Sequence, residues 1–322
     1  MIIIINRKRK LVNKLAKVKK TSIGGQALIE GIMMRGPQKI STAVRKSDGE
    51  IVVKTEDLKP NQTGGWSKLP LIRGSRALVD AMVVGVRELM YSAEFFEDEM
   101  EEDAFDRFIK KMFKGNTEKA IIYLSVTLSL VVSIGAFIIL PSFIANFLKS
   151  FITSSLILNL IEGAIRVGLF TLYIGMISKM EDIKRVFMYH GAEHKTIYAY
   201  ENGEELTVDN VRKYSTLHPR CGTSFIVNVL IISILVFSFF GWPNPWLRVL
   251  VRLMMLPVIA GISYEINKYI GKNDGTMLAR IVAKPGFQFQ RLTTKEPTDD
   301  MLEVAIAAMN EVIPEKEDED IW

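Results

Sequence analysis

The chain has 322 residues, of which 48% are hydrophobic and 24% charged, and its mean hydropathy is +0.18. A positive mean hydropathy beside that much charge is atypical of one soluble globular domain, and it indicates apolar segments that alternate with charged ones. The single cysteine excludes an internal disulfide framework, and 41 Lys and Arg against 36 Asp and Glu leave a modest positive charge.

The first 21 residues are predicted to form a basic arm. Residues 7–20 carry eight Lys and Arg, with Leu11, Leu15 and Val18 on one helical face. This composition predicts an interfacial helix on anionic lipid headgroups, or a tail that contacts RNA on a ribosome or translocon surface. A disordered tail that acts only as a positive topological signal fits equally well.

Residues 22–118 are predicted to form a cytoplasmic α+β segment. The apolar stretch 22–36 carries four glycines, and two β-rich runs follow it around Ser47-Asp48-Gly49, which is a strong hairpin signal. Apolar residues at helical spacing then predict a helix over 76–96.

Four segments have the length and apolar character of a membrane-spanning helix. They are residues 120–140, 161–178, 223–242 and 246–266, grouped as 119–180 and 223–266. The first and third carry no charge, and Pro141 is expected to end the first. The second and fourth contain charged residues and also fit buried core helices.

The charges of the connecting segments predict the orientation. Lys and Arg number 23 in residues 1–119, one in 141–161, six in 181–222, none in 243–245 and seven in 266–322. This alternation follows the positive-inside rule for four spans with both termini in the cytoplasm. We therefore predict a mainly α, polytopic protein of the cell (cytoplasmic) membrane, with four transmembrane helices and a small α+β cytoplasmic part.

Residues 267–322 are predicted to form a cytoplasmic C-terminal segment. The alternation of Phe and Gln that begins at Phe287 favours a short extended segment. Pro297 and the acidic pair Asp299-Asp300 then predict the start of an amphipathic helix.

The cytoplasmic loop 181–222 concentrates the residues with metal-binding chemistry. It contains His190, His194, His218 and Cys221, which are all the histidines and the only cysteine. Positions i and i+4 share a helical face, so the first two imidazoles are expected to project together. A turn fixed by a proline is expected to point the other two side chains one way.

Neutral imidazole and thiolate are good Zn²⁺ ligands, and a carboxylate beside a zinc-bound water can accept its proton. The order H-x-x-E-H matches the inverzincin motif, in which the two histidines bind zinc and the Glu, here Glu193, is the base. A further ligand would come from Glu265 or from the His218/Cys221 pair. A structural metal site and a metal-free, pH-responsive site stay open as alternatives.

Four charged residues lie within the predicted spans, near their outer ends: Glu162 with Arg166, and Arg248 with Arg252, each pair spaced i, i+4. Charges within a membrane usually face protein, water or one another. The arginines are expected either to reach the membrane surface or to mark a solute path or a lipid-headgroup pocket.

Five blocks in order resemble the signature blocks of the YqhQ-like family of uncharacterised bacterial membrane proteins: "IGGQALIEGIMMRGP" (23–37), "YHGAEHKTIYAYE" (189–201), "STLHPRCGTSF" (215–225), "PVIAGISYEI" (257–266) and "QRLTTKEP" (290–297). The resemblance covers residues 22–312, and the family is labelled as predicted metal-dependent enzymes. It implies a role for the first block, in which Glu30 and Arg35 would reach a headgroup, a partner or the metal site. A tight packing element is the alternative for that block.

The sequence thus predicts zinc-dependent hydrolysis of a peptide or lipid-like substrate at the cytoplasmic membrane surface. A non-enzymatic assembly or biogenesis factor with a structural metal is the second hypothesis. A channel or transporter is the third, and four spans would then favour a homo-oligomer.

Overall fold

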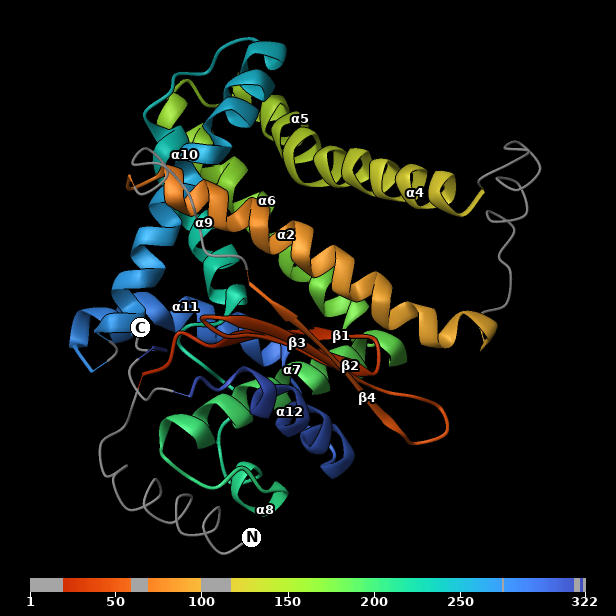
Figure 1. Ribbon diagram of the computed structural model, residues 1–322. Coiled ribbons are helices and arrows are strands. Elements are labelled where there is room, and N and C mark those ends of the chain that lie inside the picture. Colours follow the sequence, from red (N-terminus) through yellow and green to blue (C-terminus); the bar gives the residue numbers. More distant parts are fainter. Residues whose placement is uncertain (1–19, 59–68, 100–116, 274, 316–318, 321–322) are drawn as a thin grey trace, which may run out of the picture. The chain divides into compact units, whose positions relative to one another are not determined.

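The computed structural model describes residues 20–58, 69–99, 117–273, 275–315 and 319–320 (Figure 1). The strands are β1 (Gly24–Leu28), β2 (Gly31–Arg35), β3 (Lys39–Arg45) and β4 (Ile51–Asp57). The helices are α2 (Ile72–Ala93), α4 (Thr117–Ile134), α5 (Leu140–Phe147), α6 (Ser155–Ile177), α7 (Glu181–Glu201), α8 (Val208–Val211), α9 (Gly222–Ser238), α10 (Pro245–Lys272), α11 (Met277–Thr293) and α12 (Asp299–Val312). The predicted basic arm, apart from its last residues, lies outside the described residues.

The chain divides into two compact units. The first, here the sheet unit, comprises Met1–Phe95, Ile174–Asn228 and Ala260–Trp322. The second, here the helix unit, comprises Phe96–Tyr173 and Val229–Ile259. Each unit is built from segments far apart in the sequence, so the residues that meet within a unit are brought together by tertiary structure.

The sheet unit contains a four-stranded antiparallel sheet in the order β1-β2-β3-β4. The predicted hairpin is confirmed, with β3 and β4 joined by a turn in which Gly49 has φ +89°. The glycine-rich stretch 22–36, for which no strand was predicted, forms the β1–β2 hairpin, whose turn holds Glu30 at φ +46°. Four successive residues of β2 are buried, so the apolar–polar alternation that marks a half-buried strand is missing from its sequence.

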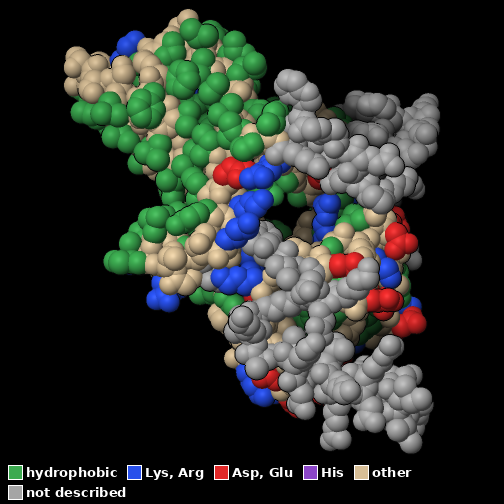
Figure 2. Space-filling view, turned by 60° about the vertical axis from the view of Figure 1, so that its left-hand side comes forward, with side chains coloured by type: hydrophobic (Ala, Val, Ile, Leu, Met, Phe, Trp, Pro, Cys, Tyr) green, Lys and Arg blue, Asp and Glu red, His purple; other side chains and the backbone are tan. Residues whose placement is uncertain are grey.

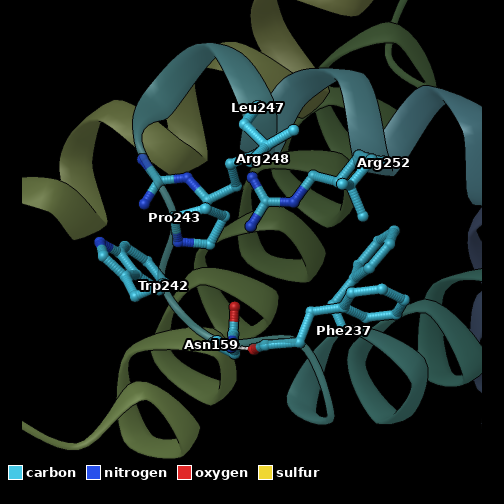
Figure 3. Close-up of a pocket in the computed structure, with 10 residues that line it drawn as sticks. Asn159, Phe237, Trp242, Pro243, Leu247, Arg248 and Arg252 are labelled. Atoms are coloured by element: carbon cyan, nitrogen blue, oxygen red, sulfur yellow. Dashed lines mark hydrogen bonds between the residues drawn. The ribbon is translucent and has the colours of Figure 1, made fainter.

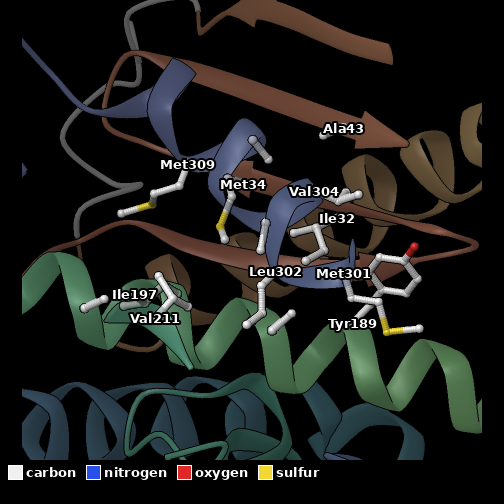
Figure 4. Packing of buried hydrophobic residues seen from close by; sticks show 14 of the residues in the cluster. Ile32, Met34, Ala43, Tyr189, Ile197, Val211, Met301, Leu302, Val304 and Met309 are labelled. Carbon is white, nitrogen blue, oxygen red and sulfur yellow. The ribbon is translucent and has the colours of Figure 1, made fainter. Parts of the chain in front are cut away.

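The core of the sheet unit lies where α12 packs against β2, β3 and α7 (Figure 4). Tyr189 of α7 and Leu302 of α12 are fully buried there together with Ile32 and Met34 of β2. The predicted helix at the C-terminal end is confirmed, since α12 begins at Asp299. Its acidic first turn is favourable at a helix N-terminus.

The extended piece predicted from Phe287 onward is wrong, because helix α11 continues to Thr293. The helix buries small and polar residues at spacings of three and four, in the order Ala279, Ala283, Gly286, Gln290 and Thr293. That spacing is helical, whereas the alternation of Phe and Gln in "FQFQ" suggested a strand.

Helix α2 presents its large apolar side chains outward. It buries Gly85, Glu88 and Ser92, whereas Met82 and Val83 are 60% and 64% exposed. Glu88 accepts a hydrogen bond from Thr42 Oγ1 of β3 at 2.9 Å. The polar side of α2 thus packs against protein and its apolar side is exposed. This arrangement is compatible with contact between the apolar side and a lipid bilayer.

Three helices are long and apolar enough to cross a membrane: Leu124–Ser150, Ser155–Ile177 and Pro245–Lys272. The first passes through a π-helical turn at Gly135–Ile139, and Pro141 follows that turn without ending the helix. Each of the three carries exposed hydrophobic side chains, among them Val131, Leu172 and Met254, and hydrophobic side chains gather over one part of the face that Figure 2 shows. The protein is therefore a membrane protein.

The predicted span 223–242 forms α9, which has 17 residues. At 1.5 Å per residue its length is about 26 Å, which is less than the hydrocarbon core of about 30 Å. The length of α9 therefore does not establish the predicted third span, and three of the four predicted spans have a helix of spanning length.

Candidate metal centre

Helix α7 and the start of α9 bring three metal-binding side chains together. His190 and His194 lie one turn apart on α7, with ring centroids separated by 4.4 Å. Cys221 immediately precedes α9, and its Sγ lies 3.1 Å from His190 Nε2. The three ligand atoms all lie within 4.8 Å of one another.

The second nitrogen of each imidazole faces a backbone carbonyl. His190 Nδ1 lies 2.9 Å from the carbonyl oxygen of Thr293, and His194 Nδ1 lies 2.5 Å from that of Thr216. A carbonyl can only accept, so both Nδ1 atoms carry hydrogen when the rings are neutral, and each Nε2 keeps a lone pair. Metal-binding histidines in proteins are oriented in this way.

The lone pair of His194 Nε2 can bind a cation. The atom is buried and makes no hydrogen bond to any of the described residues. In a tetrahedral zinc site with bonds of about 2.1 Å, neighbouring ligand atoms lie about 3.4 Å apart. The separation of 3.1 Å between His190 Nε2 and Cys221 Sγ is close to that value, and all three ligand atoms lie within 4.8 Å of one another, so the three residues fit a metal ion after small side-chain shifts.

The electrostatics of the group favour the ligand form of the thiol. Burial by itself would raise the pKa of Cys221, but the neighbouring imidazoles of His190 and His194 lower that pKa well below its usual value. Burial lowers the pKa of His190, and the Cys221 thiolate outweighs this and raises it to about 9. These pKa shifts favour an imidazolium–thiolate pair of His190 and Cys221 in the metal-free group, and a bound metal ion would take the place of the proton on His190 Nε2.

Glu193, the predicted base, lies next to this group in the chain and is held by the sheet. It is 6% exposed, and its Oε1 accepts a hydrogen bond from the backbone N–H of Gly25 at 2.9 Å. Burial raises the pKa of Glu193, and the nearby imidazoles oppose that shift only in part. A side chain at Gly25 would place its Cβ 2.7 Å from the carbonyl of Met33 and 3.0 Å from Glu193, so glycine permits this contact.

The glycine between the ligands serves close packing. A Cβ at Gly191 would collide with the carbonyl oxygen of Lys295 in the segment after α11. The backbone N–H of Lys295 in turn donates to the carbonyl of Phe187 at 2.9 Å. The segment that supplies the Thr293 carbonyl is thereby fixed against α7.

His218 lies outside the three-residue group, although the sequence placed it in a ligand pair with Cys221. Its Nε2 faces Glu201 Oε2 at 3.6 Å, and the Arg220 guanidinium also pairs with Glu201. Burial lowers the pKa of His218 to about 4, and the nearby carboxylate of Glu201 does not offset this. The expected four-residue set is reduced to three in the structure.

Gln290 of α11 fixes the turn that carries Cys221, and sequence reasoning missed it. It is fully buried, accepts from His218 N at 2.8 Å, and donates to His218 O at 2.8 Å and Ser224 Oγ at 2.9 Å. Gln290 begins the block "QRLTTKEP" (290–297), but the resemblance gave it no role, and the incorrect prediction of an extended piece removed the helical face on which it lies.

Three other predicted site residues of the sheet unit have different partners. Glu265 forms a bidentate ion pair with Arg73 of α2. Glu30 pairs with Arg185 and accepts from Tyr189 Oη at 3.2 Å, so it orients α7 from the outside. Arg35 is half-buried at the end of β2, paired in register with Gly24.

The remaining candidates, Glu162, Arg166, Arg248 and Arg252, all lie in the helix unit and are buried. Glu162 forms ion pairs with Arg166 and with Arg252. The predicted cluster of intramembrane charges is thus present in the structure.

The fold and the buried group define a membrane protein with a candidate metal centre. The chain belongs to the family described as "Protein of unknown function (DUF1385)", whose model matches residues 69–315. It is 35% identical over 292 residues to "Uncharacterized protein YqhQ" of Bacillus subtilis (strain 168), a match that covers 90% of this chain and 92% of that protein. No solved structure matches the chain.

Proposed function

We propose that the protein is a zinc-dependent hydrolase of the cell membrane. His190, His194 and Cys221 hold the metal, and the substrate is a peptide or lipid-like molecule at the cytoplasmic membrane surface. The observation that carries this proposal is the fixed tautomer of both imidazoles, because it directs two Nε2 lone pairs toward one thiolate.

The proposed topology has four spans, with α9 as the third span and both termini in the cytoplasm. A helix of 17 residues is at the lower limit of spanning lengths. The alternation of basic and non-basic loops supports this orientation. Residues 7–20 would then contact anionic headgroups on the cytoplasmic side.

Three protein ligands leave one position of a tetrahedral Zn²⁺ for water or substrate, as in catalytic zinc sites. When bound, the metal would polarise a carbonyl or lower the pKa of a water molecule. Glu193 is the group that accepts a proton, because burial raises its pKa and makes its carboxylate a stronger base. The N–H of Gly25 holds its carboxylate in place during proton transfer.

A structural metal site in a non-enzymatic assembly factor is the second candidate. It is favoured by the burial of the ligands, since His194 is 1% and Cys221 7% exposed. In that case the metal fastens α7 to the start of α9, and the basic arm docks the protein on a ribosome or translocon surface.

Metal analysis of the detergent-purified full-length protein tests the site. We expect about one zinc per chain in the wild type and a loss of at least tenfold in His190→Ala and in Cys221→Ser. His218→Ala is the matched control, because it removes a buried imidazole that lies outside the group, and it should keep its zinc. A wild type without stoichiometric metal, or a Cys221→Ser variant that retains it, contradicts the site.

Glu193→Gln separates catalysis from structure. The amide oxygen of Gln can still accept from Gly25 N, so the variant should fold and keep its zinc. A hydrolase would lose at least about 100-fold of its activity on fluorescent casein or on phospholipid vesicles. If neither probe is cleaved by the wild type and ligand variants lower only the unfolding temperature, the structural role is the correct one.

A further inference from the structure

The helix unit contains a buried cluster with an excess of positive charge. Glu162 and Arg166 come from α6, and Arg248 and Arg252 come from α10; they are 1%, 8%, 4% and 3% exposed. One carboxylate faces three guanidinium groups in this cluster. A buried charge without a counter-charge is costly, and more so within a membrane.

Both oxygens of the Glu162 carboxylate accept hydrogen bonds, and two of the three arginines are among the donors. Glu162 Oε1 accepts from Arg166 Nη2 at 2.9 Å and from Ser142 Oγ at 3.0 Å, and Oε2 accepts from Arg252 Nη2. Arg166 also donates to the carbonyl of Phe137 at 2.9 Å. The ion-pair hydrogen bonds of Glu162 therefore go to Arg166 and Arg252 and not to Arg248.

Arg248 is left with open hydrogen-bonding capacity. Its guanidinium stacks over the Trp242 ring at 4.1 Å and donates from Nη2 to the carbonyl of Ser142 at 3.3 Å. Its Nε and Nη1 are buried and have no hydrogen-bond partner within the part of the chain that the structure describes. The same holds for Arg252 Nε and Trp242 Nε1, so all the open positions are donors.

These donors border a cavity of about 430 Å³ (Figure 3). In this view the guanidinium group of Arg252 lies above Asn159, and that of Arg248 lies over the ring of Trp242. Asn159 is itself fixed, because its Nδ2 donates to the carbonyl of Phe240 at 3.0 Å. The rest of the wall is mainly apolar, so the cavity combines an anion-binding end with a hydrophobic surface.

We propose that this cavity binds the phosphate of an anionic phospholipid. Guanidinium groups match phosphate oxygens with paired hydrogen bonds, and the Trp242 N–H supplies a further donor. The apolar wall would accommodate the start of an acyl chain, and α6 and α10 are both helices long enough to cross a membrane. Free inorganic phosphate shares this chemistry without the apolar part.

Native mass spectrometry of the full-length protein in detergent tests the proposal. The probes are dioleoyl-phosphatidylglycerol, dioleoyl-phosphatidylcholine and inorganic phosphate. We expect the wild type to bind phosphatidylglycerol at least tenfold more tightly than either of the other two. Equal affinity for the two lipids would overturn the proposal. Tighter binding of inorganic phosphate than of phosphatidylglycerol would overturn the lipid as the source.

Variants assign the binding to the cavity. Arg248→Gln should weaken binding of phosphatidylglycerol about tenfold, and Lys149→Gln, which removes an exposed positive charge from the same unit, should change it less than twofold. Unchanged binding in Arg248→Gln contradicts the assignment. If that variant does not fold, Trp242→Phe keeps the ring and removes only the Nε1 donor. It should weaken binding about threefold, and an unchanged affinity would equally contradict the assignment.

Discussion

The buried clusters of the two units differ in the kind of partner that each lacks. In the metal group of the sheet unit, the unsatisfied atom among the described residues is His194 Nε2, whose lone pair lies near a thiolate and suits a cation. In the cluster of the helix unit, the unsatisfied atoms are N–H groups of Arg248, Arg252 and Trp242. These groups are all hydrogen-bond donors, so they suit an anion. The type of unsatisfied atom, and not burial alone, therefore indicates the class of ligand.

The two clusters also differ in what holds them together. Backbone carbonyls of Thr216 and Thr293 orient the histidines, so the geometry depends on the path of the loop before α9 and on the end of α11. In the helix unit a single carboxylate, that of Glu162, connects two helices. We expect the helix-unit cluster to be the more sensitive to one substitution.

The largest effect is expected for Glu162→Gln. This change leaves Arg166 and Arg252 buried without a counter-charge, and breaking a buried ion pair in this way costs about 3–5 kcal/mol. The free energy of unfolding can be measured by titrating SDS into detergent micelles of the purified protein. The double variant Glu162→Gln/Arg252→Gln should recover part of the loss, because it removes one of the unpaired charges. If Glu162→Gln alone is as stable as the wild type, the ion pairs of Glu162 do not stabilise the fold.

Gln290→Ala should have an intermediate effect. It leaves the buried N–H and carbonyl of His218 without partners, which costs about 1–3 kcal/mol. The turn that carries Cys221 is then less well fixed, so zinc content should fall as well. Gln288→Ala, an exposed change on the same helix, should stay within about 0.5 kcal/mol of the wild type. Equal zinc content and stability in the two variants would rule out a positioning role for Gln290.

The smallest effect is expected for Glu30→Gln. Its partner Arg185 is 46% exposed, so the ion pair should contribute about 0.2–1 kcal/mol. Zinc content should not change, because Glu30 contacts α7 outside the metal group. Loss of zinc in this variant would instead support the prediction that Glu30 reaches the metal site. It would also contradict the expectation that a partly exposed ion pair has a smaller effect than the buried ones.

Features with a local physical cause were predictable from the sequence. The hairpin at Ser47-Asp48-Gly49 and helix α12 follow from turn and capping chemistry. The pairing of His190 with His194 follows from helical spacing, and the long apolar helices follow from hydropathy. Each of these depends on residues within about 20 positions of one another.

Tertiary structure decided which of the remaining candidate residues join each site. It turned His218 toward Glu201, paired Glu265 with Arg73, and brought Gln290 to the turn before α9. Such contacts join residues up to about 200 positions apart, and no spacing rule encodes them. The sequence by itself determined which chemical groups the protein carries and on which helices. Long-range packing determined which groups meet, because only packing sets the direction of a buried side chain.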